Sequence, residues 1–370
     1  MLIRGITTAI NRGSLRVNRI ISKNIVYLWI WLWLVKIYDA LLNKGKIKGQ
    51  IEKTIDQFNN GEGKSLLYKE ILYCREVNLI YPEEYFLYNF ASLSVEARRS
   101  FVGNREKELL CLAINRNHAW KIFTDKWQTY SRFCDYYHRE VIRISSNEDR
   151  EKYLGFLKKY GCGVLKVANS SCGRGIILVE KSQSDDVWRK ISNSWDAGYV
   201  LEEKVRQSEQ MSIFNRTSVN TVRLATYIKD GEVVCLFAVL RTGRSGQIVD
   251  NGGSGGVIAS IDMETGIVSS NGRNEAGEVF ERHPDSKTVF KGFQMPEWEK
   301  ARELAGKLAK IVPEQLYVGW DLAYTDKGWT MIEGNSWGQF LIMQMCSLIG
   351  LRKEINETFY YTINKYKEAK

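Results

Sequence analysis

Three oxygen-bearing side chains near the end of the sequence have the types and spacing to bind a divalent cation. Asp321 lies in the apolar segment Tyr317–Tyr324, while Glu333 and Asn335 lie at the end of the segment Trp329–Glu333. The intervening TDKG is typical of a hairpin turn, and a hairpin can place alternate side chains on one face. Carboxylate and amide oxygens suit Mg²⁺. The alternative is a surface hairpin with solvated acids, although an unpaired acid in an apolar strand is costly to bury.

A lysine followed by a loop of small residues has the features of a phosphate-binding site. Lys166 ends an apolar segment and precedes NSSCGRG, which contains Gly173 and Gly175. Such a loop can bring backbone N–H groups close to phosphate oxygens while the lysine neutralises their charge. The sequence matches neither the P-loop nor the dinucleotide fingerprint. A plain hairpin turn is therefore the alternative.

Further charged residues lie at the ends of, or within, apolar segments. The segment YVLEEKVRQSEQM carries Glu202 and Glu209, which can bracket a nucleoside at its adenine amine and its ribose hydroxyls. Solvated acids at a strand end are the alternative. Arg223 is flanked by apolar residues, so its guanidinium must pair with an acid or a phosphate. Structural pairing and function are equally compatible with that position.

Alternating strands and helices are expected to position these side chains. Helices are expected at 62–77, 95–115, 126–137, 148–160, 185–194, 297–311 and 339–364, with Pro82 as a breaker. Strands are expected at 141–144, 163–168, 176–180, 199–205, 221–229 and 232–241, besides the two segments of the hairpin described above. A further hairpin is expected at 257–268, with its turn at 264–266.

The composition limits the possible partners and cofactors. The net charge of +10 over 370 residues favours an anionic partner. The seven cysteines form no CxxC pair, which argues against zinc and fits a reducing cytoplasm. The three histidines are far apart in sequence, and His283 is expected at the surface.

The N-terminal segment is basic and then strongly apolar. Residues 1–24 contain no acid, and Ile25–Val35 reads IVYLWIWLWLV. This run is shorter than the roughly 20 residues that span a bilayer. An interfacial segment resting on anionic lipid and a helix buried against the main domain remain equal alternatives.

The order of these pieces resembles the ATP-grasp superfamily. Lys126, Lys166 with its glycine loop, an acidic strand end, an arginine strand and Asp-x₁₁-Glu-x-Asn follow one another. More narrowly, SVNTVRLATYIKDGEVV, VLRTGRSGQIVDNGGSGGVIASIDMETG and DLAYTDKGWTMIEGNSW resemble the sugar-transfer-associated ATP-grasp family over about residues 100–350. The resemblance implies an α+β fold in which two subdomains clamp ATP, preceded by a helical N-terminal region.

The resemblance also implies a role for each candidate residue. Lys126 and Lys166 would hold the α- and β-phosphates, Arg223 would stabilise the transferring phosphate, and Asp321, Glu333 and Asn335 would bind Mg²⁺. Glu202 and the backbone near Val205 would receive adenine and Glu209 the ribose, or Glu203 and Gln210 if the alignment shifts by one. The loop 241–256 would serve the acceptor, with Arg241 and Arg244 holding an acid, and its glycines would let it close.

The implied function is that of a cytoplasmic ligase that uses ATP and Mg²⁺. It would convert a carboxylate to an acyl phosphate for attack by an amine or other nucleophile, in cell-surface polysaccharide synthesis, without nucleic acid. The implied domains are a basic and aromatic segment 1–45, with contact at the inner membrane surface as one of its two alternatives, a helical domain 46–125, ATP-grasp subdomains 126–205 and 206–350, and a helix 351–370. A kinase acting on a sugar or lipid hydroxyl and a non-catalytic membrane-docked module are the alternatives.

Overall fold

The computed structural model describes residues 44–115, 118–170, 175–193, 195–246 and 255–368. The predicted membrane-surface segment 1–42, Gly173 and residues 247–254 of the loop 241–256 lie outside these residues. Across the described ranges, no helix has both the length and the apolar character needed to cross a membrane.

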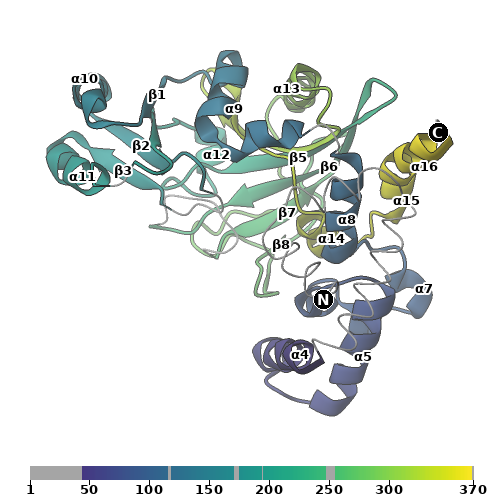
Figure 1. The fold of residues 1–370 in the computed structure, drawn as a ribbon. Helices are drawn as coiled ribbons and strands as arrows, with labels where there is room; N and C mark the ends of the chain where they lie inside the picture. The colour runs from purple at the N-terminus through teal and green to yellow at the C-terminus, as the bar shows by residue number, and fades with distance from the viewer. Residues whose placement is uncertain (1–43, 116–117, 171–174, 194, 247–254, 369–370) are drawn as a thin grey trace, which may run out of the picture.

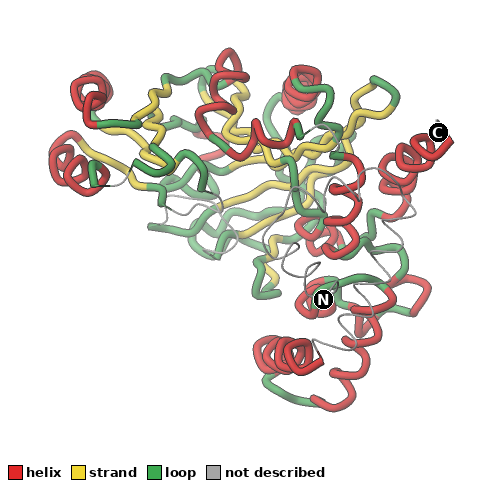
Figure 2. Tube along the Cα trace, viewed as in Figure 1, coloured by secondary structure: helices red, strands yellow, loops and turns green. Residues whose placement is uncertain are grey.

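The strands form two antiparallel sheets, drawn in yellow in Figure 2. The smaller sheet has the order β1-β4-β2-β3, and the larger has the order β11-β10-β5-β6-β7-β8-β9. The strands of the smaller sheet are β1 (Val141–Ile144), β2 (Cys162–Val167), β3 (Ile177–Glu180) and β4 (Tyr199–Glu202). Those of the larger sheet are β5 (Thr221–Lys229), β6 (Glu232–Thr242), β7 (Val257–Ile261), β8 (Gly272–Arg273), β9 (Val279–Phe280), β10 (Tyr317–Thr325) and β11 (Gly328–Asn335).

The smaller sheet is covered by two helices, α10 (Arg150–Tyr160) and α11 (Ser184–Ile191), which lie together at one end of the molecule in Figure 1. Tyr153 and Trp188, one from each helix, contribute large buried side chains to a core shared with the sheet. All strands of this sheet fall within the predicted subdomain 126–205, and all strands of the larger sheet fall within 206–350. The division into these domains stays a prediction.

The larger sheet is buried on both faces. On one face, α9 (Lys126–Phe133) and α13 (Trp298–Ile311) share a core with the strands, and on the other face α8 (Asn104–Ile114) and α14 (Leu341–Ser347) do so. A strand covered by helices on both sides reads as a continuous apolar run, and β5 is buried at all its positions except Arg223 and Lys229. The partial exposure of Arg223 therefore marks a place where the helices do not cover the sheet.

The N-terminal region is helical, as predicted, but its helices are shorter. Besides α8, the helices of this region are α4 (Lys44–Asn59), α5 (Lys64–Val77), α6 (Pro82–Leu87) and α7 (Val95–Arg98). The single helix expected over 95–115 is wrong, because α7 and α8 are separate. Gly103 lies between them, and a Cβ there would stand 2.2 Å from the carbonyl oxygen of Leu79. Pro82 does more than break a helix, since it opens α6 at the position where proline is favoured.

The single final helix expected over 339–364 is also wrong. The chain forms α14, then α15 (Arg352–Ile355), a π-helical turn (Asn356–Tyr360) and α16 (Tyr361–Glu368). Leu348 ends α14 with a φ of 54°, in the left-handed region. Gly350 then passes so close to the backbone of Ser100 that a Cβ would lie 2.1 Å from its carbonyl oxygen. Contact with the N-terminal region therefore sets this break.

We expect Gly350→Ala to lower the free energy of unfolding by about 1–3 kcal/mol, because its methyl group meets backbone that cannot rotate away. Gly306→Ala is the matched control. Gly306 lies within α13 and has open space where the methyl group of an alanine would lie, so alanine there should raise stability by up to about 1 kcal/mol. Urea denaturation measures both, and a Gly350→Ala protein as stable as the parent would contradict the packing described.

Polar side chains join the N-terminal helices to the C-terminal ones. Gln344, fully buried, donates from Nε2 to the Val102 oxygen (2.9 Å) and accepts at Oε1 from the Val102 nitrogen (2.9 Å) and the Leu351 nitrogen (3.1 Å). Arg352 pairs with Glu106 through both of its terminal nitrogens. With two antiparallel sheets, flanking helices and a helical N-terminal region, the predicted α+β class is confirmed.

Candidate active site

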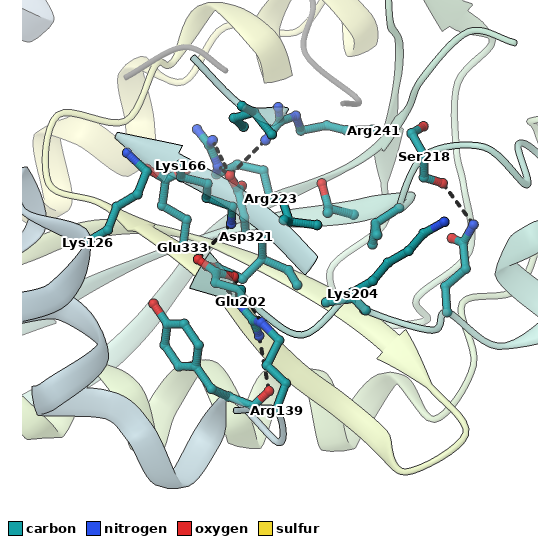
Figure 3. Close-up of a pocket in the computed structure, with 18 of the residues that line it drawn as sticks. Lys126, Arg139, Lys166, Glu202, Lys204, Ser218, Arg223, Arg241, Asp321 and Glu333 are labelled. Carbon is teal, nitrogen blue, oxygen red and sulfur yellow. Dashed lines mark hydrogen bonds and ion pairs between the residues drawn. The ribbon is translucent and has the colours of Figure 1, made fainter. Parts of the chain in front are cut away.

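A cavity of about 920 Å³ lies where the two sheets approach each other, and its lining comes from segments far apart in the sequence. Figure 3 shows the labelled side chains from both sheets converging on this space. Most of the predicted site residues line it, namely Lys126, Lys166, Glu202, Glu203, Val205, Glu209, Arg223, Arg241, Asp321, Glu333 and Asn335. The fold therefore gathers these residues around one volume.

The larger sheet sets three charged side chains in a row. In the antiparallel pairing, Asp321 of β10 lies directly opposite Glu333 of β11 on one side and Arg223 of β5 on the other. Directly opposed residues on antiparallel strands point to the same face. The pairing of β10 with β11 is interrupted between Asp321 and Leu322, at the level of this row. Irregularities of this kind often redirect side chains beside active sites.

Asp321 is held as an anion by two arginines. Arg223 Nη2 donates to Oδ2 at 2.8 Å and its Nε donates to Oδ1, while Arg241 Nη1 donates to Oδ2 at 2.9 Å. Burial alone would raise the pKa of this carboxyl group. The two guanidinium groups outweigh burial and hold the pKa at about 2.

Glu333 is in the opposite electrostatic situation. Burial raises the pKa of its carboxyl group, and the neighbouring Asp321 raises it further, while Lys126 and Lys166 oppose the rise. Two adjacent carboxylates of this kind repel each other, and a divalent cation between them would relieve the repulsion. The set of oxygen donors therefore fits Mg²⁺.

Asn335 is needed to complete that set. Its Nδ2 lies 3.4 Å from Asp321 Oδ2 and 3.4 Å from the Gly319 oxygen, which places the amide beside the carboxylates. Within the described residues, no three His, Cys, Asp or Glu side chains are grouped to hold a metal ion. A magnesium site here therefore depends on the asparagine as well as the two acids, in the pattern Mg²⁺ accepts.

Lys166 is paired with Glu202, and the pairing involves an arginine that the sequence did not single out. Lys166 Nζ lies 2.9 Å from Glu202 Oε1, and Arg139 donates to Oε2 at 2.9 Å and 3.1 Å. Burial alone would raise the pKa of Glu202, but the two cations hold it at about 2. Arg139 also donates to the Met331 oxygen at 2.7 Å, so it connects the two sheets. A single arginine before a strand is not a sequence pattern from which these contacts could be predicted.

Lys126 opens α9 and reaches the loop after β2. Its Nζ lies 3.3 Å from the Val167 oxygen and also contacts the Ser170 oxygen. Burial lowers its pKa, and the charge of Glu333 opposes this effect. Gly175, the last residue of the loop, has a φ of 72°, a backbone conformation that favours glycine. The lysine and the loop predicted to bind phosphates are thus in contact.

The remaining predicted residues lie at the margin or outside the cavity. Glu209 is exposed and pairs with Arg216 through two hydrogen bonds, at 2.7 Å and 3.1 Å. Arg244 is not part of the lining and pairs with Asp285 at 2.9 Å. His283 was expected at the surface, which is wrong. It is fully buried, and its Nε2 lies 3.0 Å from the Gly243 oxygen. The segment after β9 therefore packs against the first residues of the loop 241–256.

The lining also contains basic residues that were not predicted. Lys204 and Arg206 follow β4 and line the cavity beside Glu203 and Val205. Both side chains are exposed, so neither is a buried charge whose need for a partner could be predicted from the sequence. A connecting segment with alternating charges reads from sequence as an ordinary solvated loop.

Two sheets enclosing a cavity with paired lysines, an arginine and an Asp/Glu/Asn group define an ATP-grasp protein. The chain belongs to the sugar-transfer associated ATP-grasp family, whose profile matches residues 105–359. The predicted resemblance is therefore confirmed. No curated protein matches the sequence.

Solved structures similar to this chain are distant. The ATP-grasp ligase PsnB, complexed with precursor peptide PsnA2 and AMPPNP, has 12% identity and a TM-score of 0.42, over 70% of this chain and 66% of its own. D-alanyl-alanine synthetase A from Vibrio cholerae has 10% identity and a TM-score of 0.43, over 70% of this chain and 72% of its own. N5-carboxyaminoimidazole synthase from Aspergillus clavatus, in complex with ADP and 5-aminoimidazole ribonucleotide, has 10% identity and a TM-score of 0.38, over 59% of this chain and 46% of its own.

Proposed function

We propose that this protein is an ATP- and Mg²⁺-dependent ligase that activates a carboxylate as an acyl phosphate for attack by an amine or another nucleophile. The observation that carries the proposal is that Lys126, Lys166 and Arg223 line one cavity together with Asp321 and Glu333. Phosphoryl transfer depends mainly on positioning and charge neutralisation. This set of side chains supplies both without a nucleophilic residue.

The reaction proceeds in two steps. A carboxylate oxygen of the first substrate attacks the γ-phosphorus of ATP, the bond to the β-phosphate oxygen breaks, and ADP leaves. The nitrogen of an amine then attacks the acyl carbon, and the carbon–oxygen bond to phosphate breaks. An amine that arrives as an ammonium ion first releases one proton to water, which frees the nitrogen lone pair for this attack. Inorganic phosphate then leaves, and a second proton passes from the nitrogen to water.

Each charged group has a place in this scheme. Lys126 and Lys166 neutralise the α- and β-phosphates, and Arg223 binds the transferring phosphoryl group. Arg241 binds the substrate carboxylate from the neighbouring strand β6. Glu333, Asp321 and Asn335 would hold the metal, with Asp321 also paired to Arg223 and Arg241, and the metal would offset phosphate charge.

The nucleoside is proposed to bind along the segment that follows β4. Both oxygens of Glu202 are engaged, by Lys166 and by Arg139, which favours a role in positioning Lys166. Glu203 lines the same cavity and is half-buried, so it and the backbone near Val205 are the better partners for adenine. Glu209, at the exposed margin, remains the proposed ribose contact.

The family's description supports a setting in sugar transfer, and we place the reaction in cell-surface polysaccharide synthesis in the cytoplasm. The carboxylate and the amine come from small molecules or sugars of that pathway. Contact with the inner membrane surface through residues 1–42 belongs to the same proposal. It would be tested by liposome sedimentation with and without those residues.

The fate of a labelled carboxylate oxygen tests the ligase chemistry. Purified protein is incubated with ATP, Mg²⁺ and sugar acids or amino acids labelled with ¹⁸O in the carboxyl group. Ligation should move one ¹⁸O atom into inorganic phosphate, detected by mass spectrometry. Phosphate that stays attached to a hydroxyl acceptor would instead establish the kinase alternative. Unlabelled phosphate alone would show simple ATP hydrolysis and contradict the proposal.

A further inference from the structure

The cavity extends beyond the proposed phosphate site, along the larger sheet. Arg241 of β6 lies opposite Ile258 of β7, which in turn lies opposite Arg273 of β8. Glu275 follows two residues after Arg273 and lines the cavity. Neighbouring strands lie about 4.8 Å apart, so β8 is about 10 Å from β6. A small molecule can therefore lie across β7, between the strand that carries Arg241 and the segment after β8 that carries Glu275.

Glu275 differs from the paired acids of the cavity. Glu202, Glu209 and Asp321 each have an arginine at hydrogen-bond distance. Among the described residues, no hydrogen-bond or ion-pair partner of the Glu275 carboxylate is found, although the charge of Arg241 acts on it. Burial raises the pKa of this carboxyl group, and Arg241 only partly opposes the rise. A partly buried carboxylate in this position is stabilised by a cation that arrives from outside.

The cavity that Glu275 lines also offers apolar surface for an organic cation. Ile258, Trp337 and Ile342 line the same cavity and contribute apolar surface. A metal ion would require several oxygen ligands, and within the described part of the chain no three His, Cys, Asp or Glu side chains are grouped to hold one. A carbon-bearing molecule with an ammonium group matches both the carboxylate and the apolar surface.

The charges of the cavity favour a separate carboxylate for the amine. Lys126, Lys166, Arg223 and Arg241 attract the phosphates and the carboxylate substrate. Glu202 and Asp321 already pair with three of these cations, so neither acid offers an unpaired carboxylate to an amine, which is protonated at neutral pH. The carboxylate of Glu275, at the end of the cavity beyond Arg241, would attract the amine substrate, while the basic residues attract the carboxylate substrate and ATP.

We propose that Glu275 binds the ammonium group of the amine substrate, at the end of the cavity beyond Arg241. The proposal rests on the ligase function proposed above and narrows its nucleophile to an amine. It makes Glu275 a specificity-determining residue, because a carboxylate binds an ammonium group more strongly than it binds a neutral hydroxyl or thiol group.

The test separates the two half-reactions. Acetate, L-glutamate and glucuronate are supplied with ATP and Mg²⁺, and hydroxylamine traps any acyl phosphate as a hydroxamate. Hydroxylamine is uncharged at neutral pH, so its reaction should not need Glu275. Glycine, ethanolamine and glucosamine then replace hydroxylamine, and phosphate release gives the KM for each amine.

The Glu275→Gln protein should form hydroxamate within about twofold of the parent, while its KM for the active amine rises about 10- to 100-fold, the loss of one contact to a charged group. Glu281→Gln is the control, since Glu281 is an exposed acid of the same region outside the cavity lining. It should leave both values unchanged.

Three outcomes would overturn the proposal. An unchanged amine KM in Glu275→Gln would refute it while leaving the ligase function standing. So would a parent protein that forms hydroxamate but responds to none of the three amines. A parent protein that forms no hydroxamate would refute the ligase function, and this proposal with it.

Discussion

Replacing Glu333 with glutamine should reduce Mg²⁺-dependent ADP release at least about 100-fold without lowering stability. The change keeps the shape of the side chain but removes the carboxylate proposed to bind the metal. Because burial and Asp321 raise the pKa of Glu333, folding disfavours its charged form. The folded protein therefore loses stability relative to the unfolded chain as pH rises above the ordinary glutamate value of 4.5. At neutral pH, Glu333→Gln should be as stable as the parent or more so.

A coupled ADP assay and urea denaturation at pH 5 and pH 8 measure the two effects. Glu314→Gln serves as the control, since Glu314 is an exposed acid outside the cavity and should affect neither. Loss of turnover accompanied by loss of stability at pH 8 would indicate a structural role for Glu333 in place of metal binding.

Replacing Asp321 with asparagine should abolish ATP turnover and also destabilise the protein, by about 3–5 kcal/mol at neutral pH. Asparagine leaves the guanidinium groups of Arg223 and Arg241 close together without their shared anion. The pKa of Asp321 is lowered from 3.8 to about 2, so its contribution to stability is fully present above pH 3.8 and is lost as pH falls through about 2. The difference between the two proteins should therefore shrink in acid.

Asp326→Asn is the matched control, because Asp326 is an exposed aspartate of the same hairpin and should change neither property. Thermal unfolding measures the stability of each protein. ADP release is measured separately at about 10 °C, where both proteins should stay folded, so that a loss of turnover is not caused by unfolding. Full turnover by Asp321→Asn would contradict the enzymatic proposal and favour the non-catalytic alternative.

Helices and strands could be predicted from the sequence where their bounds depend on residues close together in the chain. Val141–Ile144 and Thr221–Lys229 form strands with the predicted bounds, since their apolar runs end at turn residues. The break near Gly350 was missed because it is set by contact with Ser100, which lies far earlier in the chain. Periodicity within a short window carries no information about such a contact.

The same distinction holds for the site. Asp321, Glu333 and Arg223 could be singled out because each is a charge within or at the end of an apolar strand, where burial demands a partner. Arg139 and Glu275 lie outside such runs, and only the pairing of strands brings them to the cavity. The roles carried over from the family remain predictions, since sequence can place a charge in a strand without fixing its partner.

The buried amide of Gln344 has a consequence for biosynthesis. Its partners, the backbone groups of Val102 and Leu351, come from opposite ends of the chain, and Glu106 must likewise await Arg352. During translation, the first helices therefore leave the ribosome long before the segment that locks them in place exists. A truncation to the stretch matched by the family, 105–359, would strip Gln344 of its Val102 contacts. Such a fragment should be recovered mainly as insoluble material.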